Sequence, residues 1–199
     1  MAQGHGDTMS LARSLARWRA RARRALRAAS AITTVPRVPP PPAPQHPDAL
    51  PPPRIRRADA VDLDALVALE ERAFSHDRLS RAQFRRHLDS DSALVLIAKE
   101  DGRLLGVAVV FFRRGARVAR LYSLVTAPEA RGRGVGAALL EAAERAARVR
   151  RCRSLRLEVR TDNRTALRLY ETRGYHHLVH RPGYYEDGSD AHRYEKPLR

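Results

Sequence analysis

The chain has 199 residues, of which 43% are hydrophobic, so it is long enough for one globular domain with extensions. Lys and Arg number 38 against 22 Asp and Glu, which gives a net charge of +16, and only two of the 38 basic residues are lysines. A composition rich in arginine and alanine is typical of a GC-rich genome. The charge alone is therefore weak support for a nucleic-acid partner. A single cysteine, Cys152, excludes a disulfide framework and a cysteine-based zinc site, and the longest apolar run, Leu104 to Phe112, is too short to span a bilayer. Since no segment near the start resembles a signal peptide, we predict a cytoplasmic protein without a transmembrane segment.

The first 53 residues differ from the remainder. Ten of the 13 prolines lie between Pro36 and Pro53, which indicates a stiff, solvated segment without a core. Before it, residues 10–30 have the spacing of a basic helix with one apolar stripe, which could lie on an anionic membrane or contact RNA or a ribosome. The alternatives are a disordered extension or a chain that starts at Met9. We predict a disordered basic and Pro-rich N-terminal extension over residues 1–53, and leave these roles open.

From Arg54 onward the hydrophobic spacing is that of a globular domain. It predicts helices over residues 62–74, 80–88, 134–149 and 165–173, with Ser80 capping the second and Gly174 ending the fourth. Strands are predicted over residues 55–58, 93–99, 104–112, 118–126, 155–159, 175–179 and 192–196. This order predicts an α/β domain over residues 54–199, with a mixed central sheet flanked by helices.

A glycine-rich segment, Arg131-Gly132-Arg133-Gly134-Val135-Gly136, joins a predicted strand to a predicted helix. Its glycines let the backbone pass close to a ligand, and the unpaired amides and dipole of the helix start favour an anion such as a pyrophosphate. It is not a Walker loop, because no Lys-Ser/Thr pair follows the last glycine. On its own, the segment could equally be a flexible turn.

A second block follows 27 residues after Gly136: Asn163-Arg164-Thr165-Ala166-Leu167-Arg168-Leu169-Tyr170-Glu171, then Gly174-Tyr175. Together the two blocks resemble the GNAT superfamily of acetyl-CoA-dependent N-acetyltransferases, whose loop reads Arg-x-x-Gly-x-Gly and whose second block reads Asn-x-x-Ala-x-x-x-Tyr-x-x-x-Gly-Tyr/Phe. The resemblance covers Ile55 to Leu198. It implies the GNAT fold, in which two central strands splay apart to admit acetyl-CoA.

The resemblance also implies which residues bind acetyl-CoA, the co-substrate. Strand residues would bind the acetyl and pantetheine groups through their backbones, the loop would hold the pyrophosphate, and Asn163 would bind the coenzyme, although it could merely cap the following helix. The predicted cofactor-binding residues are Leu124, Val125, Thr126, Arg131, Gly132, Arg133, Gly134, Val135, Gly136, Ala137 and Asn163.

Within the superfamily, the chain is most similar to the ribosomal-protein alanine N-acetyltransferase group. The similarity is carried by Leu157-Glu158-Val159-Arg160, by Asn163 and Tyr170, and by a late segment from Tyr184 to Ala191. In that group the matching glutamate is the general base and the matching tyrosine is the general acid, so the resemblance assigns these roles to Glu158 and Tyr170. The segment from Phe74 to Ser80 lacks the group's usual Pro-Trp-Ser, which leaves the acceptor open.

The chemistry calls for such a pair independently. An acceptor ammonium must lose a proton before it attacks the thioester, which a carboxylate can accept directly or through a water, and a phenol can protonate the departing thiolate. The residues by themselves also allow plainer roles. Glu158 could form a salt bridge with Arg156 or Arg160 on the same strand face, and Tyr170 could be an ordinary packing tyrosine.

These observations predict an N-acetyltransferase that transfers acetyl from acetyl-CoA to a primary amine, with a protein or peptide N-terminus as the first choice of acceptor. The alternatives are a small-molecule amine acetyltransferase and a non-catalytic acyl-CoA-binding module. No histidine or cysteine spacing indicates a metal site, so no metal is predicted. An acidic cluster late in the chain could attract a cationic amine or be a solvated loop; it consists of Glu186, Asp187 and Asp190.

Overall fold

The structure is a computed structural model, and it describes residues 53–74 and 78–199. The predicted helix over residues 10–30 and, apart from Pro53, the predicted extension lie outside the described residues.

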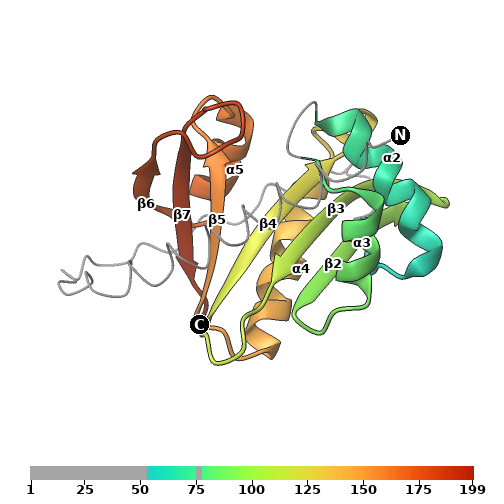
Figure 1. The fold of residues 1–199 in the computed structure, drawn as a ribbon, viewed down its shortest axis with the longest axis horizontal. Helices are drawn as coiled ribbons and strands as arrows, with labels where there is room; N and C mark the ends of the chain where they lie inside the picture. The colour runs from blue at the N-terminus through green and yellow to red at the C-terminus, as the bar shows by residue number, and fades with distance from the viewer. Residues whose placement is uncertain (1–52, 75–77) are drawn as a thin grey trace, which may run out of the picture. The chain divides into compact units, whose positions relative to one another are not determined.

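The described residues form one mixed sheet of seven strands in the order β1-β2-β3-β4-β5-β7-β6 (Figure 1). All neighbouring strands pair antiparallel except β4 and β5, which pair parallel. The strands are β1 (Arg54–Arg57), β2 (Ala93–Glu100), β3 (Arg103–Phe111), β4 (Val118–Thr126), β5 (Ser154–Arg160), β6 (His176–Arg181) and β7 (Ala191–Pro197).

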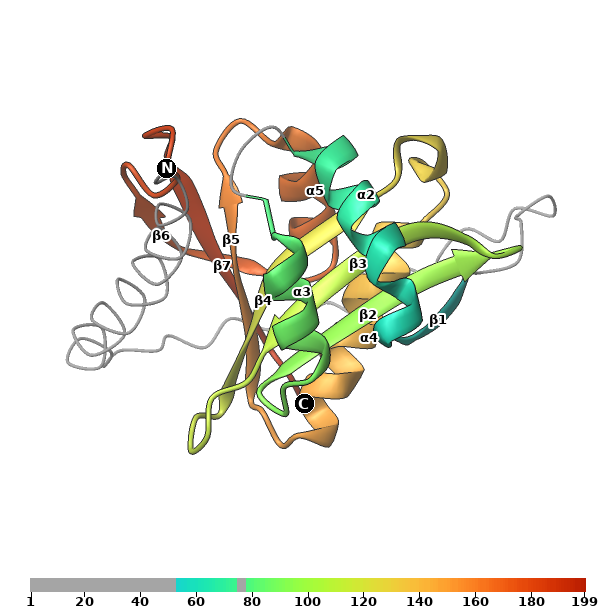
Figure 2. The ribbon, with the colours of Figure 1, turned by 45° about the vertical axis from the view of Figure 1, so that its right-hand side comes forward.

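Helices cover both faces of this sheet. In Figure 2, α2 and α3 lie in front of β2, β3 and β4, and α4 lies behind them. The helices are α2 (Leu63–Ala73), α3 (Arg81–Leu88), α4 (Val135–Val149) and α5 (Arg164–Thr172), with short 3-10 turns η2 (Ala60–Asp62) and η3 (Pro128–Ala130). The predicted helix signals are present: Ser80 caps α3 by accepting from the Gln83 amide, and Gly174 follows α5 with φ +81°.

The core lies between α4, the sheet and α2. The centre of β3 is fully buried, and Leu139, Leu140 and Ala143 of α4 are each at most 1% exposed. The carboxyl group of Glu70 is buried with them. Glu70 of α2 is 2% exposed, its Oε1 accepts the Leu79 amide at 3.0 Å, and burial raises its pKa to about 7.

The predicted fold class is confirmed, and each strand and helix predicted from Arg54 onward is present with ends within two residues of the prediction. The sequence did not predict that β7 lies between β5 and β6, nor the two 3-10 turns. Within the described residues, no helix is long and apolar enough to cross a membrane.

Candidate active site

Strands β4 and β5 pair at one end and then separate. Val118–Leu121 pairs with Ser154–Leu157, and the described structure shows no further pairing between the two strands. Beyond that point β4 continues to Thr126 beside β3 alone, and β5 continues to Arg160 beside β7 alone. Figure 1 shows the two strands spreading apart in this direction. One edge of β4 therefore carries backbone groups without a neighbouring strand.

The alternation of β4 decides which of its backbone groups face this opening. The Ala127 amide donates to the Leu105 carbonyl of β3 at 2.8 Å. In an antiparallel ladder every second residue turns its polar groups to the same neighbour, so Val125 also faces β3. Leu124 and Thr126 turn theirs to the opening. Two of the three strand residues predicted to bind acetyl-CoA thus offer backbone hydrogen bonds there.

The glycine loop follows the same end of β4 and leads into α4. Gly132 and Gly134 have φ of +77° and +74°, a backbone conformation that residues with a side chain rarely adopt. Gly134 is the N-cap of α4, and no side chain caps the helix there. The first bond of the helix runs from the Ala138 amide to the Gly134 carbonyl. Three first-turn amides therefore have no acceptor among the described residues: Val135, Gly136 and Ala137. Together with the helix dipole they are suited to accept an anion, and the pyrophosphate site there remains a prediction.

Arg133 is the loop residue whose geometry fits its predicted role least. Its Nη2 lies 2.6 and 2.8 Å from the two carboxylate oxygens of Glu100, and its amide donates to the Ala130 carbonyl at 3.4 Å. One guanidinium nitrogen and the backbone amide of Arg133 are therefore engaged within the protein, whereas its buried Nε has no hydrogen-bond partner among the described residues. Arg131 beside it is exposed and forms no ion pair with a described carboxylate, so it is the loop arginine better placed to meet a phosphate.

Helix α5 lies against the start of α4. A Cβ atom on Gly136 would stand 3.3 Å from Thr126 Oγ1 and 3.6 Å from Leu169 Cδ2, so β4, α4 and α5 meet at this glycine. Asn163 caps α5, because its Oδ1 accepts the Ala166 amide at 3.1 Å. The capping role of Asn163 is thus present, and its contact with the coenzyme remains a prediction.

Tyr170 extends from α5 into the interior. Its side chain is 6% exposed and packs edge-on against Tyr175, with ring centroids 5.7 Å apart. Burial raises the pKa of the Tyr170 hydroxyl, so the phenol stays neutral. Within the described part of the chain no hydrogen bond to this hydroxyl is found. A neutral phenol whose hydroxyl is not held by the protein can donate its proton to a ligand.

Glu158 lies one residue past the last position of β5 that pairs with β4. Two arginines hold its carboxylate. Arg120 of β4 approaches Oε2 through Nε at 2.9 Å and Nη2 at 2.8 Å. Arg193 of β7 approaches Oε1 through the same two nitrogens, both at 2.7 Å. The exposed side-chain fractions are 4% for Glu158, 13% for Arg120 and 12% for Arg193. We call these three residues the Glu158 cluster; its charges are almost buried and sum to one excess positive charge.

The salt bridge that the sequence allowed for Glu158 exists, but with other partners than expected. Arg156 donates to Glu195 at 2.6 Å, and Arg160 pairs with a loop carboxylate at 2.8 Å. Residues two apart on one strand are separated by about 7 Å, whereas directly opposite residues on paired strands are closer. The register places Arg193 directly opposite Glu158.

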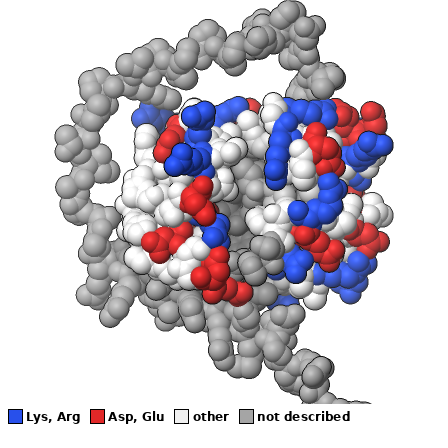
Figure 3. All heavy atoms as spheres, turned by 90° about the horizontal axis from the view of Figure 1, so that it is seen from above, with Lys and Arg blue, Asp and Glu red and all other residues white. Residues whose placement is uncertain are grey.

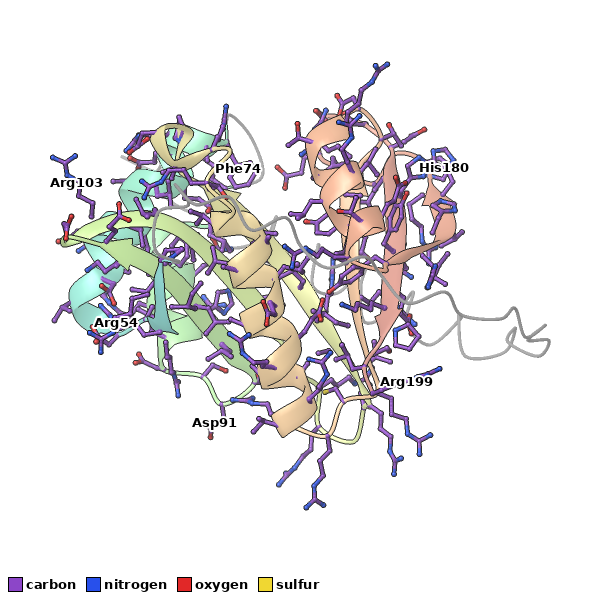
Figure 4. The ribbon with its side chains drawn as sticks, turned by 180° about the vertical axis from the view of Figure 1, so that it is seen from behind. Arg54, Phe74, Asp91, Arg103, His180 and Arg199 are labelled. Atoms are coloured by element: carbon purple, nitrogen blue, oxygen red, sulfur yellow. The ribbon has the colours of Figure 1, made fainter. Side chains whose placement is uncertain are left out.

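Glu158 and Tyr170 reach the opening from opposite faces of the sheet. Arg120 is paired with Phe111, whose ring packs 4.9 Å from a histidine of α3, so the Glu158 cluster lies on the α3 face. Tyr170 comes from α5, which Figure 4 shows on the same side as α4. Tyr185 is close to both: after burial and Tyr184, the charge of Glu158 and the Tyr170 phenol also raise its pKa. That Glu158 and Tyr170 act on one bound substrate remains a prediction.

Figure 3 looks onto this end of the molecule, where side chains of both charges lie along the facing edges of the two halves of the domain. Two members of the acidic cluster, which could attract an amine or be a solvated loop, have partners within the protein. Asp187 accepts from Arg160 at 2.8 Å, and Asp190 accepts a loop amide at 2.8 Å and lies 2.9 Å from His180. Because these carboxylates have partners, the geometry does not favour them as an open site for a cation.

Sequence reasoning did not place three residues at the site. Arg120 and Arg193 are two arginines among many, and neither belongs to a motif. Tyr184, whose hydroxyl accepts from Arg120 Nη2, was noted only as part of the late segment. The alternation of β4 would have put Arg120 on a polar face, but the strand order was needed to place it near Glu158. In the described ranges, no group of three or more potential ligand side chains is arranged to hold a metal ion.

Residues 63–175 match the model of the Acetyltransferase (GNAT) family. The chain therefore belongs to the GNAT acetyltransferases, and it is an acetyl-CoA-dependent acyltransferase. The separated strands and the glycine loop described above agree with what the resemblance to this family implies about the fold.

Similar proteins support the same conclusion. An uncharacterized N-acetyltransferase of Methanocaldococcus jannaschii is 33% identical over 138 residues, which cover 69% of this chain and 86% of the relative. An N-alpha-acetyltransferase of Sulfurisphaera tokodaii is 28% identical over 156 residues, covering 73% and 93%. The solved structure of the ribosomal-protein-S18-alanine N-acetyltransferase from Escherichia coli has a TM-score of 0.65 and 28% identity, covering 73% and 93%. The predicted resemblance is thereby confirmed.

Proposed function

We propose that this protein acetylates the N-terminal amine of a protein or peptide, with Glu158 as general base and Tyr170 as general acid. The observation that carries the proposal is the opening between β4 and β5, which has the Glu158 cluster on one face and Tyr170 on the other. Two of the similar proteins, the N-alpha-acetyltransferase and the ribosomal-protein-S18-alanine N-acetyltransferase, are named for the same class of acceptor.

Acetyl-CoA fits the opening from the side of α4 and α5. Its pyrophosphate would accept from the first-turn amides of α4, where the helix dipole favours negative charge. Its pantetheine amides would pair with the free backbone groups of Leu124 and Thr126. This direction of entry carries the thioester toward Tyr170.

Glu158 accepts the amine proton under a constraint set by its arginines. Each carboxylate oxygen already accepts from one guanidinium Nε and lies within 2.8 Å of an Nη2, so the proton passes through a bound water or after one guanidinium nitrogen has moved aside. The arginines also fix the orientation of the carboxylate at the mouth of the opening. The base is thus rigidly placed and strongly hydrogen-bonded.

An N-terminal amine suits such a base better than a lysine side chain. An α-amino group has an ordinary pKa of about 7.7–8.0, whereas a lysine amine lies near 10.4. At neutral pH a substantial fraction of α-amines is already deprotonated, so fewer of them must transfer a proton to the carboxylate before they react. The excess positive charge of the Glu158 cluster also disfavours a lysine ammonium beside it, because that group is almost fully protonated at neutral pH.

The test is a turnover screen with acetyl-CoA in which release of the coenzyme thiol is followed. The acceptors are peptides with free N-termini, the same peptides blocked at the N-terminus but carrying one lysine, and small-molecule amines. We expect the free N-termini to react and the blocked peptides not to. Turnover confined to small amines would overturn the choice of acceptor, and binding of acetyl-CoA without turnover on any amine would favour a non-catalytic binding module.

A further inference from the structure

Six exposed arginines gather at the end of the domain where β4 begins, away from the glycine loop. They stand on the loop between β3 and β4, on the loop between α4 and β5, and at the last residue of the chain. We call them the basal arginine cluster: Arg114, Arg117, Arg150, Arg151, Arg153 and Arg199.

Backbone contacts hold these segments together. The Arg153 amide donates to the Arg117 carbonyl at 2.6 Å, and the C-terminal segment donates back to the Arg153 carbonyl at 2.7 Å. Arg150 Nη1 donates to the Asp91 carbonyl at 2.6 Å. Figure 4 shows this end around the labelled Asp91 and Arg199, with nitrogen-tipped side chains extending away from the sheet. The charges are therefore gathered by the fold, although two loops and the C-terminus supply them.

The guanidinium groups of the cluster are not paired with carboxylates of the described residues, and the terminal oxygen of Arg199 accepts from Arg148, which is outside the cluster, at 3.0 Å. None of its six arginines forms an ion pair with a described carboxylate, whereas on other surfaces Arg72 pairs with Glu129 and Arg145 with Glu141, both at 2.7 Å. Adjacent like charges repel one another and destabilise a compact state, so a bound polyanion would stabilise this end.

One member stands where an arginine is unfavourable. Arg151 has φ +58° just after α4, the position at which glycine commonly ends a helix. Its amide donates to the Arg148 carbonyl at 2.8 Å, as that helix ending requires. Arginine thus occupies a position where glycine would cost less conformational energy.

We infer that the basal arginine cluster binds the phosphodiester backbone of RNA. Each guanidinium presents a planar fork of donors that matches a phosphate, and several forks within a short span can neutralise neighbouring phosphates. The cluster stands on connecting loops, not on a helix face or strand ribbon of the kind that enters a DNA major groove, which favours recognition of backbone and shape.

Other occupants fit less well. A second copy of this face carries the same charge, and residues 1–52 contain eight arginines against two aspartates, so neither complements the cluster. A membrane would need apolar side chains to insert, and Val149, the last residue of α4, is the one large hydrophobic side chain that the described structure exposes at this end of the domain. A polyanion without an apolar phase is the remaining match.

The cluster lies far from the candidate active site. It adjoins the first residue of β4 and the glycine loop follows the last, and nine strand residues separate the two ends by about 26 Å. RNA on the cluster therefore leaves the opening accessible. This inference does not depend on the proposed acceptor, because RNA binding is measured without acetyl transfer.

The test measures binding of the full chain to a fluorescent RNA hairpin by anisotropy across a salt series. The cluster variant combines Arg114→Gln, Arg117→Gln and Arg153→Gln. Its matched control removes the same charge from ion-paired arginines elsewhere: Arg72→Gln, Arg81→Gln and Arg145→Gln. Since each lost phosphate contact reduces the slope of log K against log salt by about 0.7–0.9, we expect the cluster variant to lose about 2 to 3 units of slope and the control to lose much less.

Arg151→Gly separates binding from folding. It should raise the melting temperature, because glycine relieves the left-handed backbone, and yet weaken RNA binding several-fold. Replacing the three cluster arginines by lysine should retain the slope. Equal losses in the cluster variant and its control would show that binding follows net charge and would overturn the inference, as would parent-like binding in the cluster variant. Equally tight binding of a DNA duplex would overturn the choice of RNA.

Discussion

Glu158→Gln is expected to change both the rate and the stability of the enzyme. The amide cannot accept the proton of the amine, so turnover should fall by about 10²–10⁴-fold, the usual scale of general base catalysis. The same change leaves Arg120 and Arg193 almost buried without a counterion, and turns an amide N–H toward one of them. Removing one partner of a buried ion pair costs about 3–5 kcal/mol of folding free energy.

Arg193→Gln provides the matched comparison for that stability loss. It leaves Glu158 and Arg120 as a balanced pair and removes the excess positive charge. We therefore expect Arg193→Gln to lose less folding free energy than Glu158→Gln. If the two variants unfold at the same denaturant concentration with equal slopes, the charge balance of the Glu158 cluster is not what stabilises it.

The rate effect is read from steady-state turnover across pH on variants shown to be folded. Acetyl-CoA binding, measured by calorimetry, is the control for an intact site. The Glu158→Gln rate should recover partly above about pH 8, where an N-terminal amine is already neutral. Parent-like turnover in a folded Glu158→Gln variant would refute the assignment of the base. If product release limits the rate, pre-steady-state measurement of the acetyl transfer step replaces the steady-state comparison.

The remaining predictions concern the coenzyme, the general acid and a buried carboxyl. Gly134→Val and Gly136→Val should each weaken acetyl-CoA binding severely, the first by straining a left-handed turn and the second by crowding the junction of β4, α4 and α5; unchanged affinity in calorimetry would contradict the loop assignment. Tyr170→Phe should keep acetyl-CoA affinity but lose turnover without rescue at high pH, because its defect lies in thiolate departure; rescue of this variant alone would reverse the two catalytic roles. The pKa of Glu70 is raised from 4.5 to about 7 in the folded state, so the fold binds this proton more tightly than the unfolded chain does, and stability present below pH 4.5 is lost as pH rises to about 7. Glu70→Gln should therefore stabilise the protein by up to about 3 kcal/mol at pH 8 and have little effect at pH 4.5 in urea unfolding; an equal effect at both pH values would exclude the titration as its cause.

The sequence alone determined the elements and the coenzyme loop, because their signals are local. Periodic apolar residues, the Ser80 cap and the Gly174 stop depend on neighbours within a turn or a strand. The loop from Arg131 to Gly136 follows the same rule, since left-handed glycines and free first-turn amides are properties of the chain at that point. Because these motifs are local, the sequence by itself indicates the GNAT family.

Tertiary structure decided how the candidate site is assembled. The insertion of β7 between β5 and β6 brings Arg193 opposite Glu158, and the end of pairing after Leu121 opens the edge of β4. Arg120 meets Glu158 from 38 positions away in the sequence. Strand order and register set the two arginine contacts and the open edge of β4. The periodicity of a single strand shows only which residues share a face.

The basal arginine cluster shows the same division. The composition shows an arginine-rich chain, and the sequence places only three of these six arginines together, in Arg150-Arg151-Cys152-Arg153. Two loops and the C-terminus come together only because β4 and β5 start side by side, with Val118 opposite Ser154. The sequence therefore determined how much positive charge the protein carries, and the parallel pairing of two strands decided where that charge gathers, because that contact joins residues from separate parts of the chain.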